Sequence, residues 1–381
     1  MKIGIITARY SVSGVPLAQA RLATALAREG HEVDYVIGCV QSDVEVPQPE
    51  GSRLMVLSAP TVRAAFRPLC RYLREERPEI IFSAEDHLNA AVAIAAILTR
   101  SKVRISGSSR ISPFDTYSDK PFSKGWVLKH LVRATAWRQN VMTCVSQGNL
   151  EQYRTVMPNI TYHVAYNVVA DAGVNALLSE PLAGDPWLPA HTRAGNATDL
   201  PVVLAAGTLE TWKGFDNLIR AIGLLCEAGR PTRLIVLGEG SQRSTLENLV
   251  AELGLGDFVR LPGREANPYR FFVRASAFAL SSHIESFGNV LVEAMLAGAT
   301  PVATDCPTGP REVLGEGRYG YLVQPGSPKA LAEGIAEALD NPLSSALLKS
   351  GAARFTERAV LARHEELLKV RLMADTTEGP Q

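Results

Sequence analysis

One polar segment between two apolar stretches holds the densest group of chemically useful side chains. The segment is SSHIESFGNVLVEAMLAGATPVATD, residues 281–305. Its pattern predicts a strand, a polar loop and then a helix that begins at Gly288 or Asn289. Free backbone N–H groups and the helix dipole at such a terminus favour an anion, and Gly288 lets a phosphate approach the backbone. A diphosphate is the ligand that suits this loop.

Glu285 and Glu293 of the same segment require a different partner. Carboxylates repel a phosphate, so we expect them to accept hydrogen bonds from neutral hydroxyls, which sugars and ribose supply. Glu293 follows Glu285 by eight residues, or about two turns plus 80° of a helix, so both can point into one cleft. The alternative is that Glu285 is an exposed loop acid and Glu293 caps or pairs along its own helix.

A second candidate segment is AAGTLETWKGFDNLIRAI, residues 205–222, in which a strand leads through a glycine turn to a helix. Lys213 stands just before that helix. A cation there could neutralise the charge that develops on a diphosphate leaving group. The alternative is a solvated surface lysine, which is the usual environment of this residue type.

The elements that must position these residues follow a βα alternation. Short apolar runs alternate with longer amphipathic stretches, which predicts parallel sheets. A helix is expected at 16–28, ending at Gly30, and others begin near Ser327 and Ser344. The predicted strands are 2–6, 33–37, 54–58, 79–84, 103–107 and 141–146, followed by 202–207, 233–238, 259–263, 278–282, 301–304 and 319–323.

The strand pattern is interrupted once, which predicts two domains. Residues 180–200 are rich in Pro, Gly and small polar residues and indicate a linker. We therefore expect an α/β fold of two Rossmann-like, doubly wound domains, residues 1–179 and 201–343, that face each other across a cleft. The last helices, residues 344–381, are expected to pack back on the N-terminal domain, with 375–381 frayed.

Composition excludes several classes of protein. The 381 residues are 46% apolar and 20% charged, as in globular proteins with two cores. Basic and acidic residues number 39 each, which argues against nucleic acid as a partner. No Gly-x-Gly-x-x-Gly follows the first strand, which disfavours a dinucleotide dehydrogenase. Five scattered cysteines, and apolar runs too short to span a bilayer, indicate a cytoplasmic protein.

The motifs together resemble those of a known family over nearly the whole chain: the retaining glycosyltransferases of the GT-B fold, family 4. ESFGNVLVEAMLAGATPVATD resembles the family's Glu-x7-Glu segment, and GTLETWKGFDNLIRAI its Lys-Gly segment. Further matches are LGEG at 237–240, DCPTGPREVL at 305–314, Ser13-Gly14 and LATALAREGHEVDYV. The resemblance implies transfer of a hexose or N-acetylhexosamine from a nucleotide-diphosphate sugar.

The resemblance also implies roles for individual residues. Glu285 would contact the donor sugar, Glu293 would hold the ribose and Lys213 would bind the diphosphate. The backbone amides from Phe287 through Gly288, Asn289 and Val290 to Leu291 would hold the sugar and phosphate. Gly14 would let the N-terminal loop approach the donor, and Gly207 and Thr208 would also lie at the donor. Gly238 and Gly240 would shape the nucleotide pocket, with Arg264 and Pro268 in the loop beside the base.

Two segments depart from the family pattern. Thr208 stands where the family has an arginine, so one diphosphate cation is missing, and Arg264 or Arg311 are the candidate replacements. Ser108-Ser109-Arg110 replaces the Thr-x-His turn after the fifth strand. His87, in AEDHLN, is a possible sugar contact, with a surface or capping role as the alternative.

The implied mechanism needs neither metal nor cofactor. Helix dipole and Lys213 would stabilise the departing nucleoside diphosphate, and the donor phosphate would assist deprotonation of an acceptor that attacks from the same face. The absence of an Asp-x-Asp motif agrees with this expectation. The competing interpretations are a sugar-nucleotide epimerase or a glycan phosphorylase on the same fold, or a non-catalytic nucleotide-sugar binder.

The acceptor is expected to be a glycan or a polyprenyl-linked glycolipid used in cell-envelope polysaccharide synthesis. Two basic amphipathic segments, 63–78 and 123–139, could lie on anionic lipid, which would place the protein at the inner face of the plasma membrane. The alternative is that one side of each helix packs on its sheet while its cations are solvated.

Overall fold

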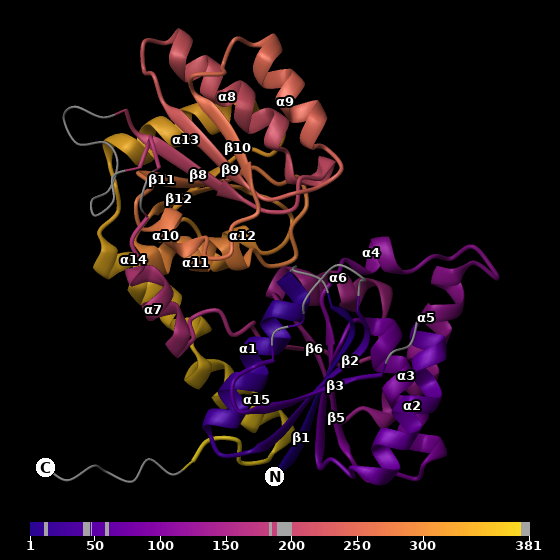
Figure 1. Ribbon diagram of the computed structural model, residues 1–381. Helices are drawn as coiled ribbons and strands as arrows, with labels where there is room; N and C mark the ends of the chain where they lie inside the picture. Colours follow the sequence, from indigo (N-terminus) through magenta and orange to yellow (C-terminus); the bar gives the residue numbers. More distant parts are fainter. Residues whose placement is uncertain are drawn as a thin grey trace, which may run out of the picture. The chain divides into compact units, whose positions relative to one another are not determined.

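The computed structural model describes residues 1–10, 14–40, 46, 48–57, 61–182, 185–188 and 200–374. The chain divides into two units (Figure 1). The first comprises Met1–Val169 with Phe355–Gln381, and the second comprises Ala170–Arg354.

The first unit contains a parallel sheet with the strand order β3-β2-β1-β4-β5-β6-β7. Its strands are β1 (Lys2–Tyr10), β2 (Glu32–Val40), β3 (Ser52–Val56), β4 (Ile80–Ala84), β5 (Arg104–Ser109), β6 (Val141–Cys144) and β7 (His163–Val164). Its helices are α1 (Gly14–Arg28), α2 (Val62–Glu75), α3 (Asp86–Leu98), α4 (Pro113–Thr116), α5 (Lys124–Thr135), α6 (Gln147–Val156) and α15 (Glu357–Leu368), with a 3-10 turn η1 (Ala136–Arg138).

Helices cover both faces of this sheet. On one face, Ile3 and Ile5 of β1 pack with Leu22 of α1 and Leu361 of α15. On the other face, Ile6 of β1 belongs to a core that includes residues of α2 and α3. A strand buried on both faces needs a continuous apolar run, which is why β1 reads as such rather than as an alternating pattern.

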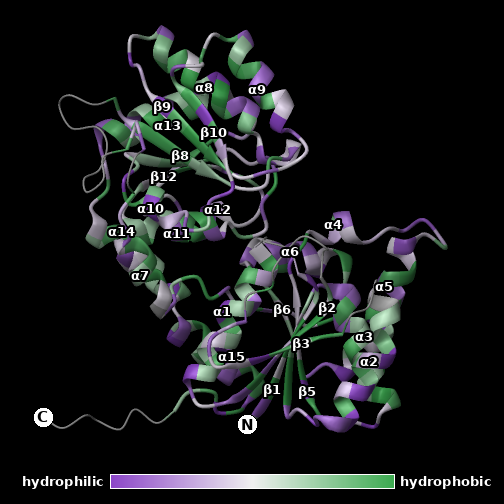
Figure 2. Ribbon diagram, viewed as in Figure 1, coloured by the Kyte–Doolittle hydropathy of each residue, from purple (hydrophilic) through white to green (hydrophobic). Residues whose placement is uncertain are grey.

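The second unit repeats the architecture with the strand order β10-β9-β8-β11-β12-β13, and its strands β8 and β9 are largely hydrophobic (Figure 2). The strands are β8 (Val202–Ala206), β9 (Arg233–Leu237), β10 (Val259–Gly263), β11 (Ala277–Leu280), β12 (Thr300–Thr304) and β13 (Tyr321–Val323). The helices are α7 (Ala172–Ser179), α8 (Phe215–Glu227), α9 (Arg243–Glu252), α10 (Tyr269–Phe272), α11 (Asn289–Ala297), α12 (Pro310–Val313), α13 (Pro328–Asp340) and α14 (Ser345–Ala352), with 3-10 turns η2 (Thr211–Lys213) and η3 (Ala353–Phe355), the latter spanning the boundary between the units.

The predicted fold class is confirmed: the chain has two Rossmann-like, parallel α/β sheets. Every predicted strand is present, and α13 and α14 begin directly after Ser327 and Ser344, whose hydroxyls accept from Ala330 N–H and Leu347 N–H. Such serine caps satisfy N–H groups that have no partner within the helix. The sequence missed β7, because a two-residue strand carries no periodic signal.

The boundaries of the units differ from the predicted ones. The second unit begins at Ala170 rather than after the linker, since Asn267 donates from its amide to the carbonyl oxygen of Leu177 in α7 at 3.0 Å. Helix α14 also belongs to this unit, where it packs on α11, whereas we expected it on the first domain. Of the two C-terminal helices that we expected on the first domain, α15 lies in the first unit and α14 does not.

The segment predicted as a linker is only partly described. Within it, Asp185 forms an ion pair with Arg260 at 2.8 Å, and the Arg260 guanidinium lies 4.3 Å from the ring centre of Trp187. These contacts fix residues 185–188 on the second unit. Residues 183–184 and 189–199, and the predicted frayed end 375–381, lie outside the described residues. No helix in the described ranges is long and apolar enough to cross a membrane.

Candidate functional site

The strand order of the second unit defines where its site should lie. The sheet runs outward from β8 to β9 and β10 on one side, and from β11 to β12 and β13 on the other. In open parallel sheets, ligands bind beyond the carboxyl ends of the strands at the point where the order reverses. That point lies between β8 and β11, and the segments that leave these strands contain Lys213 and Glu285.

Lys213 and Glu285 meet at this point. The ammonium Nζ of Lys213 donates to Oε2 of Glu285 at 2.6 Å, and the two side chains are only 18% and 16% exposed. Their backbones are fixed as well: Ser281 donates from its hydroxyl to the carbonyl oxygen of Lys213 at 2.8 Å, and the Thr308 hydroxyl donates to the carbonyl oxygen of Glu285. The structure therefore places both predicted residues in one partly enclosed ion pair.

The start of α11 lies beside this pair. Gly288 is the N-cap of α11, with φ +93°, and no side chain caps the helix. A Cβ built on Gly288 would lie 3.6 Å from Cγ of Glu285. The side chains of Phe287 and Leu291 are buried, so these residues can face a ligand only with their backbone. The glycine N-cap leaves room beside the first turn of α11, and the anion site expected there remains a prediction.

Glu293 projects from the first turns of α11 and has a partner that the sequence did not reveal. The hydroxyl of Tyr269 donates to Oε1 of Glu293 at 3.1 Å, and Tyr269 is buried in α10. Helix α10 has four residues and lies 24 residues before Glu293. Neither periodicity nor a motif could have indicated this contact.

Glycines form the wall at the ends of β8 and β9. Gly238 has φ +141°, and a Cβ built on it would lie 1.9 Å from the carbonyl oxygen of Gly207. Gly207 N–H donates to the carbonyl oxygen of Leu237 at 3.0 Å. The loops that follow β8 and β9 therefore approach so closely that a side chain at Gly238 would not fit. Gly240 makes a similar approach to Leu209.

The structure separates the two candidate replacements for the missing arginine. Thr208 is exposed, as is Arg264, and Arg264 has no ion pair within the described ranges. Arg311 instead pairs with Asp305, and with Glu316 at 3.3 Å. Of these two arginines, Arg311 is already paired, whereas Arg264 has no ion pair among the described residues.

A buried thiol lies behind the ion pair. Cys306 donates from Sγ to the carbonyl oxygen of Ser282 at 2.9 Å. Burial raises the pKa of the Cys306 thiol to about 11, and the charge of Glu285 acts in the same direction. The thiol stays neutral near pH 7 and supports the loop as a hydrogen-bond donor rather than as a nucleophile.

Two predicted residues lie in the first unit. Gly14 is the first residue of α1, and Ser13 is outside the described residues. His87 lies in the first turn of α3, where its Nε2 is 3.6 Å from Oε2 of Glu85 and its side chain is 44% exposed. Across the described residues, no three His, Cys, Asp or Glu side chains are placed to hold a metal ion.

Comparison with known proteins assigns the class. Residues 190–358 match the family model described as glycosyl transferases group 1. An N-acetylgalactosaminyltransferase of Campylobacter jejuni, which acts on N-acetylgalactosamine-N,N'-diacetylbacillosaminyl-diphospho-undecaprenol, is 25% identical over 332 residues, covering 86% of this chain and 85% of its own. A D-inositol 3-phosphate glycosyltransferase of Thermobispora bispora is 36% identical over 202 residues, covering 50% of this chain and 46% of its own.

Solved structures show the same fold. The apo form of the lipopolysaccharide outer core galactosyltransferase WaaB superposes with a TM-score of 0.70 and 16% identity, over 97% of this chain and 99% of the other. HepE of Anabaena, in complex with UDP-glucose, gives 0.72 and 19% identity over 97% and 99% of the chains. The chain thus has the GT-B fold of these glycosyltransferases. Its segment 190–358 is similar to the group 1 glycosyl transferases.

Proposed function

We propose that the protein transfers a hexose or N-acetylhexosamine from a nucleotide-diphosphate sugar, with retention of anomeric configuration, to a glycan or polyprenyl-linked glycolipid of the cell envelope. The observation that carries the proposal is the Lys213–Glu285 ion pair beside the uncapped start of α11. The relatives' names support the acceptor class, because the Campylobacter jejuni enzyme is named for an undecaprenol-linked substrate and WaaB for lipopolysaccharide.

We propose that Lys213, Glu285 and the start of α11 bind different parts of the donor. In the free site Lys213 is neutralised by Glu285. A bound diphosphate would compete for the ammonium group, while the α11 terminus would supply N–H donors and its dipole. Glu285, released from Lys213, would then accept hydrogen bonds from sugar hydroxyls. This exchange of partners stabilises the leaving group with fixed protein charges, and we propose that transfer requires no metal or other cofactor.

We propose a front-face course for the reaction, as the resemblance to retaining glycosyltransferases implies. The glycosidic bond to the diphosphate breaks, the nucleoside diphosphate leaves with the electron pair, and the acceptor oxygen bonds to the anomeric carbon. The acceptor proton passes to the donor phosphate, so no protein base is needed. Glu293 would hold the ribose, with Tyr269 fixing its carboxylate. Arg264 would supply the second cation near the diphosphate in place of the arginine that Thr208 replaces.

The test is a transfer assay with purified protein, UDP-, GDP- and ADP-sugars and a lipid-linked acceptor. We expect a glycoside of unchanged anomeric configuration and a nucleoside diphosphate, in the presence of a chelator. Glu285→Gln should nearly abolish transfer, whereas the matched control Glu247→Gln, on the exposed side of α9, should not. A free epimerised sugar as product would indicate an epimerase, and a sugar phosphate would indicate a phosphorylase. Donor binding without turnover would indicate a non-catalytic binder.

We also propose peripheral contact of the first unit with anionic lipid at the inner face of the plasma membrane. Phe114, Phe122 and Trp137 are 58%, 88% and 73% exposed, and Arg67 and Arg71 are exposed on α2. Aromatic and basic side chains on one unit suit a membrane interface. Sedimentation with anionic vesicles at low salt should carry the protein down, and neutral vesicles should not.

Not every cation in the predicted basic segment 123–139 supports this contact. Lys129 is buried and donates to Asp119 at 2.6 Å, while Arg138 donates to the carbonyl oxygens of Ser101 and Val103 at 2.7 and 3.0 Å. These two cations are used within the fold, because their donors are bonded to other groups of the first unit. The lipid contact therefore rests on α2 and on the exposed aromatic side chains.

A further inference from the structure

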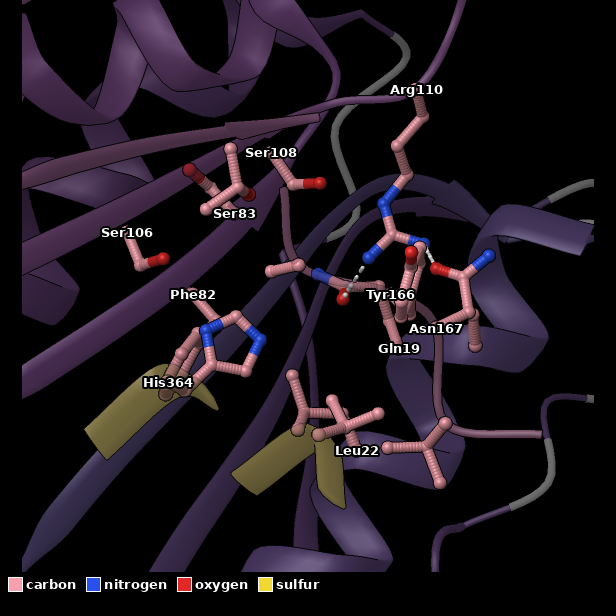
Figure 3. Close-up of a pocket in the computed structure, with 15 residues that line it drawn as sticks. Gln19, Leu22, Phe82, Ser83, Ser106, Ser108, Arg110, Tyr166, Asn167 and His364 are labelled. Carbon is pink, nitrogen blue, oxygen red and sulfur yellow. Dashed lines mark hydrogen bonds between the residues drawn. The ribbon is translucent and has the colours of Figure 1, made fainter. Parts of the chain in front are cut away.

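A small polar pocket lies in the first unit, beside the carboxyl-terminal halves of β4, β5 and β6 (Figure 3). Its volume is about 10 Å³, enough for about one water molecule. None of its lining residues is an Asp or Glu. Its polar lining includes Gln19, Ser106, Ser108, Arg110, Thr143 and His364.

Arg110 carries the positive charge of the pocket without a bonded counter-charge. Its Nη1 donates to Oδ1 of Asn167 at 2.6 Å and its Nη2 donates to Oε1 of Gln19 at 3.1 Å, both neutral acceptors (Figure 3). Its Nε is buried and has no hydrogen-bond partner. A guanidinium group has five N–H donors, so these two bonds leave most of them available.

Arg110 has no acidic side chain bonded to it in the described part of the chain. Glu85 acts on the guanidinium through its charge, yet it forms no ion pair with Arg110 in the described part of the chain and does not line the pocket. Its carboxylate lies instead 3.6 Å from Nε2 of His87. A partly buried cation held only by neutral groups favours a further anion beside it.

Two more nitrogen atoms of the pocket lack partners among the residues that the structure describes. Nε2 of Gln19 and Nδ1 of His364 are both buried and unbonded, and the two side chains are 1% and 6% exposed. Burial and the charge of Arg110 lower the pKa of His364 to about 4, so the ring is neutral near pH 7. Buried polar atoms normally have partners. Nε2 of Gln19 is an amide donor, and its missing partner beside Arg110 indicates a ligand group that accepts hydrogen bonds.

The pocket opens beside Arg110. Arg110 and Tyr166 are half-buried, whereas the other lining residues are buried. Only the end of a ligand can fit in a space of about one water molecule. A planar carboxylate meets this condition, since it can lie against the edge of a guanidinium group with one oxygen directed inward.

We propose that the Arg110 pocket binds the carboxylate of an acidic sugar substrate, of the uronate type, with Gln19 as a second donor. The identity of the molecule that carries the carboxylate rests on the proposed glycosyltransferase reaction. The anion site itself does not, because it depends only on groups of the first unit.

The test compares thermal unfolding of the full chain in glucuronate and in glucose, with ionic strength held constant by chloride. Bound ligand stabilises the native state by mass action, so glucuronate should raise the Tm of the wild type saturably by about 2–4 °C, and glucose should not. Arg110→Gln should remove the response. The matched control Arg154→Gln, at an exposed arginine of α6, should keep it.

Gln19→Glu keeps the test decisive if Arg110→Gln does not fold. The new carboxylate replaces the unbonded Nε2 beside Arg110, so the variant should unfold at a higher temperature without ligand and should no longer respond to glucuronate. Equal responses of wild type and Arg110→Gln would overturn the proposal, as would stabilisation by phosphate or chloride alone. If the wild type shows the glucuronate response but no glycosyl transfer, the proposed function is wrong and the anion site stands.

Discussion

The two units place cations in different surroundings at the carboxyl ends of their parallel strands. In the second unit, the ends of β8 and β11 bring Lys213 and Glu285 into one ion pair. In the first unit, the end of β5 carries Arg110, whose bonded partners are the neutral side chains of Asn167 and Gln19. One site is neutralised within itself and the other is not.

The difference shows how a repeated fold acquires distinct binding properties. Both sheets are parallel and doubly wound, with both faces covered by helices, so the topology alone predicts only where ligands bind. A paired cation must exchange its partner when a diphosphate binds, which allows the carboxylate to be released to a sugar. An unpaired cation gains its first counter-charge from the ligand. The following variants test this contrast.

Removal of the paired cation should give the largest effect. Lys213→Met leaves Glu285 without its partner and removes the charge that stabilises the leaving group, so kcat should fall by about 10²–10³-fold. Steady-state transfer kinetics measure this loss, and circular dichroism checks the fold. The control is Lys349→Met, near the end of α14. A change in the acceptor KM with kcat unchanged would contradict the role of Lys213 at the diphosphate.

Acid should destabilise the first unit through His364. Burial lowers its pKa from 6.5 to about 4, so between these values the unfolded chain binds a proton that the native state does not. The contribution of the neutral His364 ring to the free energy of unfolding is fully present above pH 6.5 and is lost as the pH falls toward 4. This difference in pKa corresponds to a loss of up to about 3 kcal/mol. Urea unfolding of wild type and His364→Gln across this range measures it.

In His364→Gln this part of the pH dependence should disappear, while His130→Gln, at an exposed position of α5, should keep the wild-type profile. Parallel curves for wild type and His364→Gln would contradict the burial of a neutral ring beside Arg110. Because His364 lines the Arg110 pocket, this measurement also examines the electrostatics of the unpaired cation.

The two units also differ in what surrounds a crowded glycine. A Cβ on Gly238 would lie 1.9 Å from the backbone oxygen of Gly207, at φ +141°, whereas a Cβ on Gly107 in β5 would meet the side-chain oxygen of Gln139 at 2.0 Å. Gly238→Ala should therefore cost about 2 kcal/mol of stability, and Gly107→Ala less, because Gln139 can move. Equal losses in denaturant titrations would show that the β8–β9 wall is not rigid.

The sequence predicted elements and local motifs well but contacts between distant segments poorly. Glu285, Lys213 and the start of α11 were indicated by strand-loop-helix patterns, which are local. Tyr269, Thr308 and the Arg110 pocket depend on packing between segments far apart in the chain, and no spacing encodes them. The expected position of α14 was wrong for the same reason: its amphipathic pattern fits either unit, and packing against α11 decides it.

The smallest expected effect concerns Tyr269, which fixes Glu293 in the second unit. Tyr269→Phe removes one hydrogen bond to a carboxylate, worth about 1–2 kcal/mol when it supports a bound ribose. Donor KM should rise by about tenfold, with kcat nearly unchanged, because the contact lies away from the reacting bond. Tyr321→Phe, which removes a hydroxyl bonded to the Asn341 carbonyl oxygen, is the matched control. A fall in kcat with an unchanged KM would move Glu293 from the ribose to the reacting centre, and the division of labour between the two glutamates would have to be reversed.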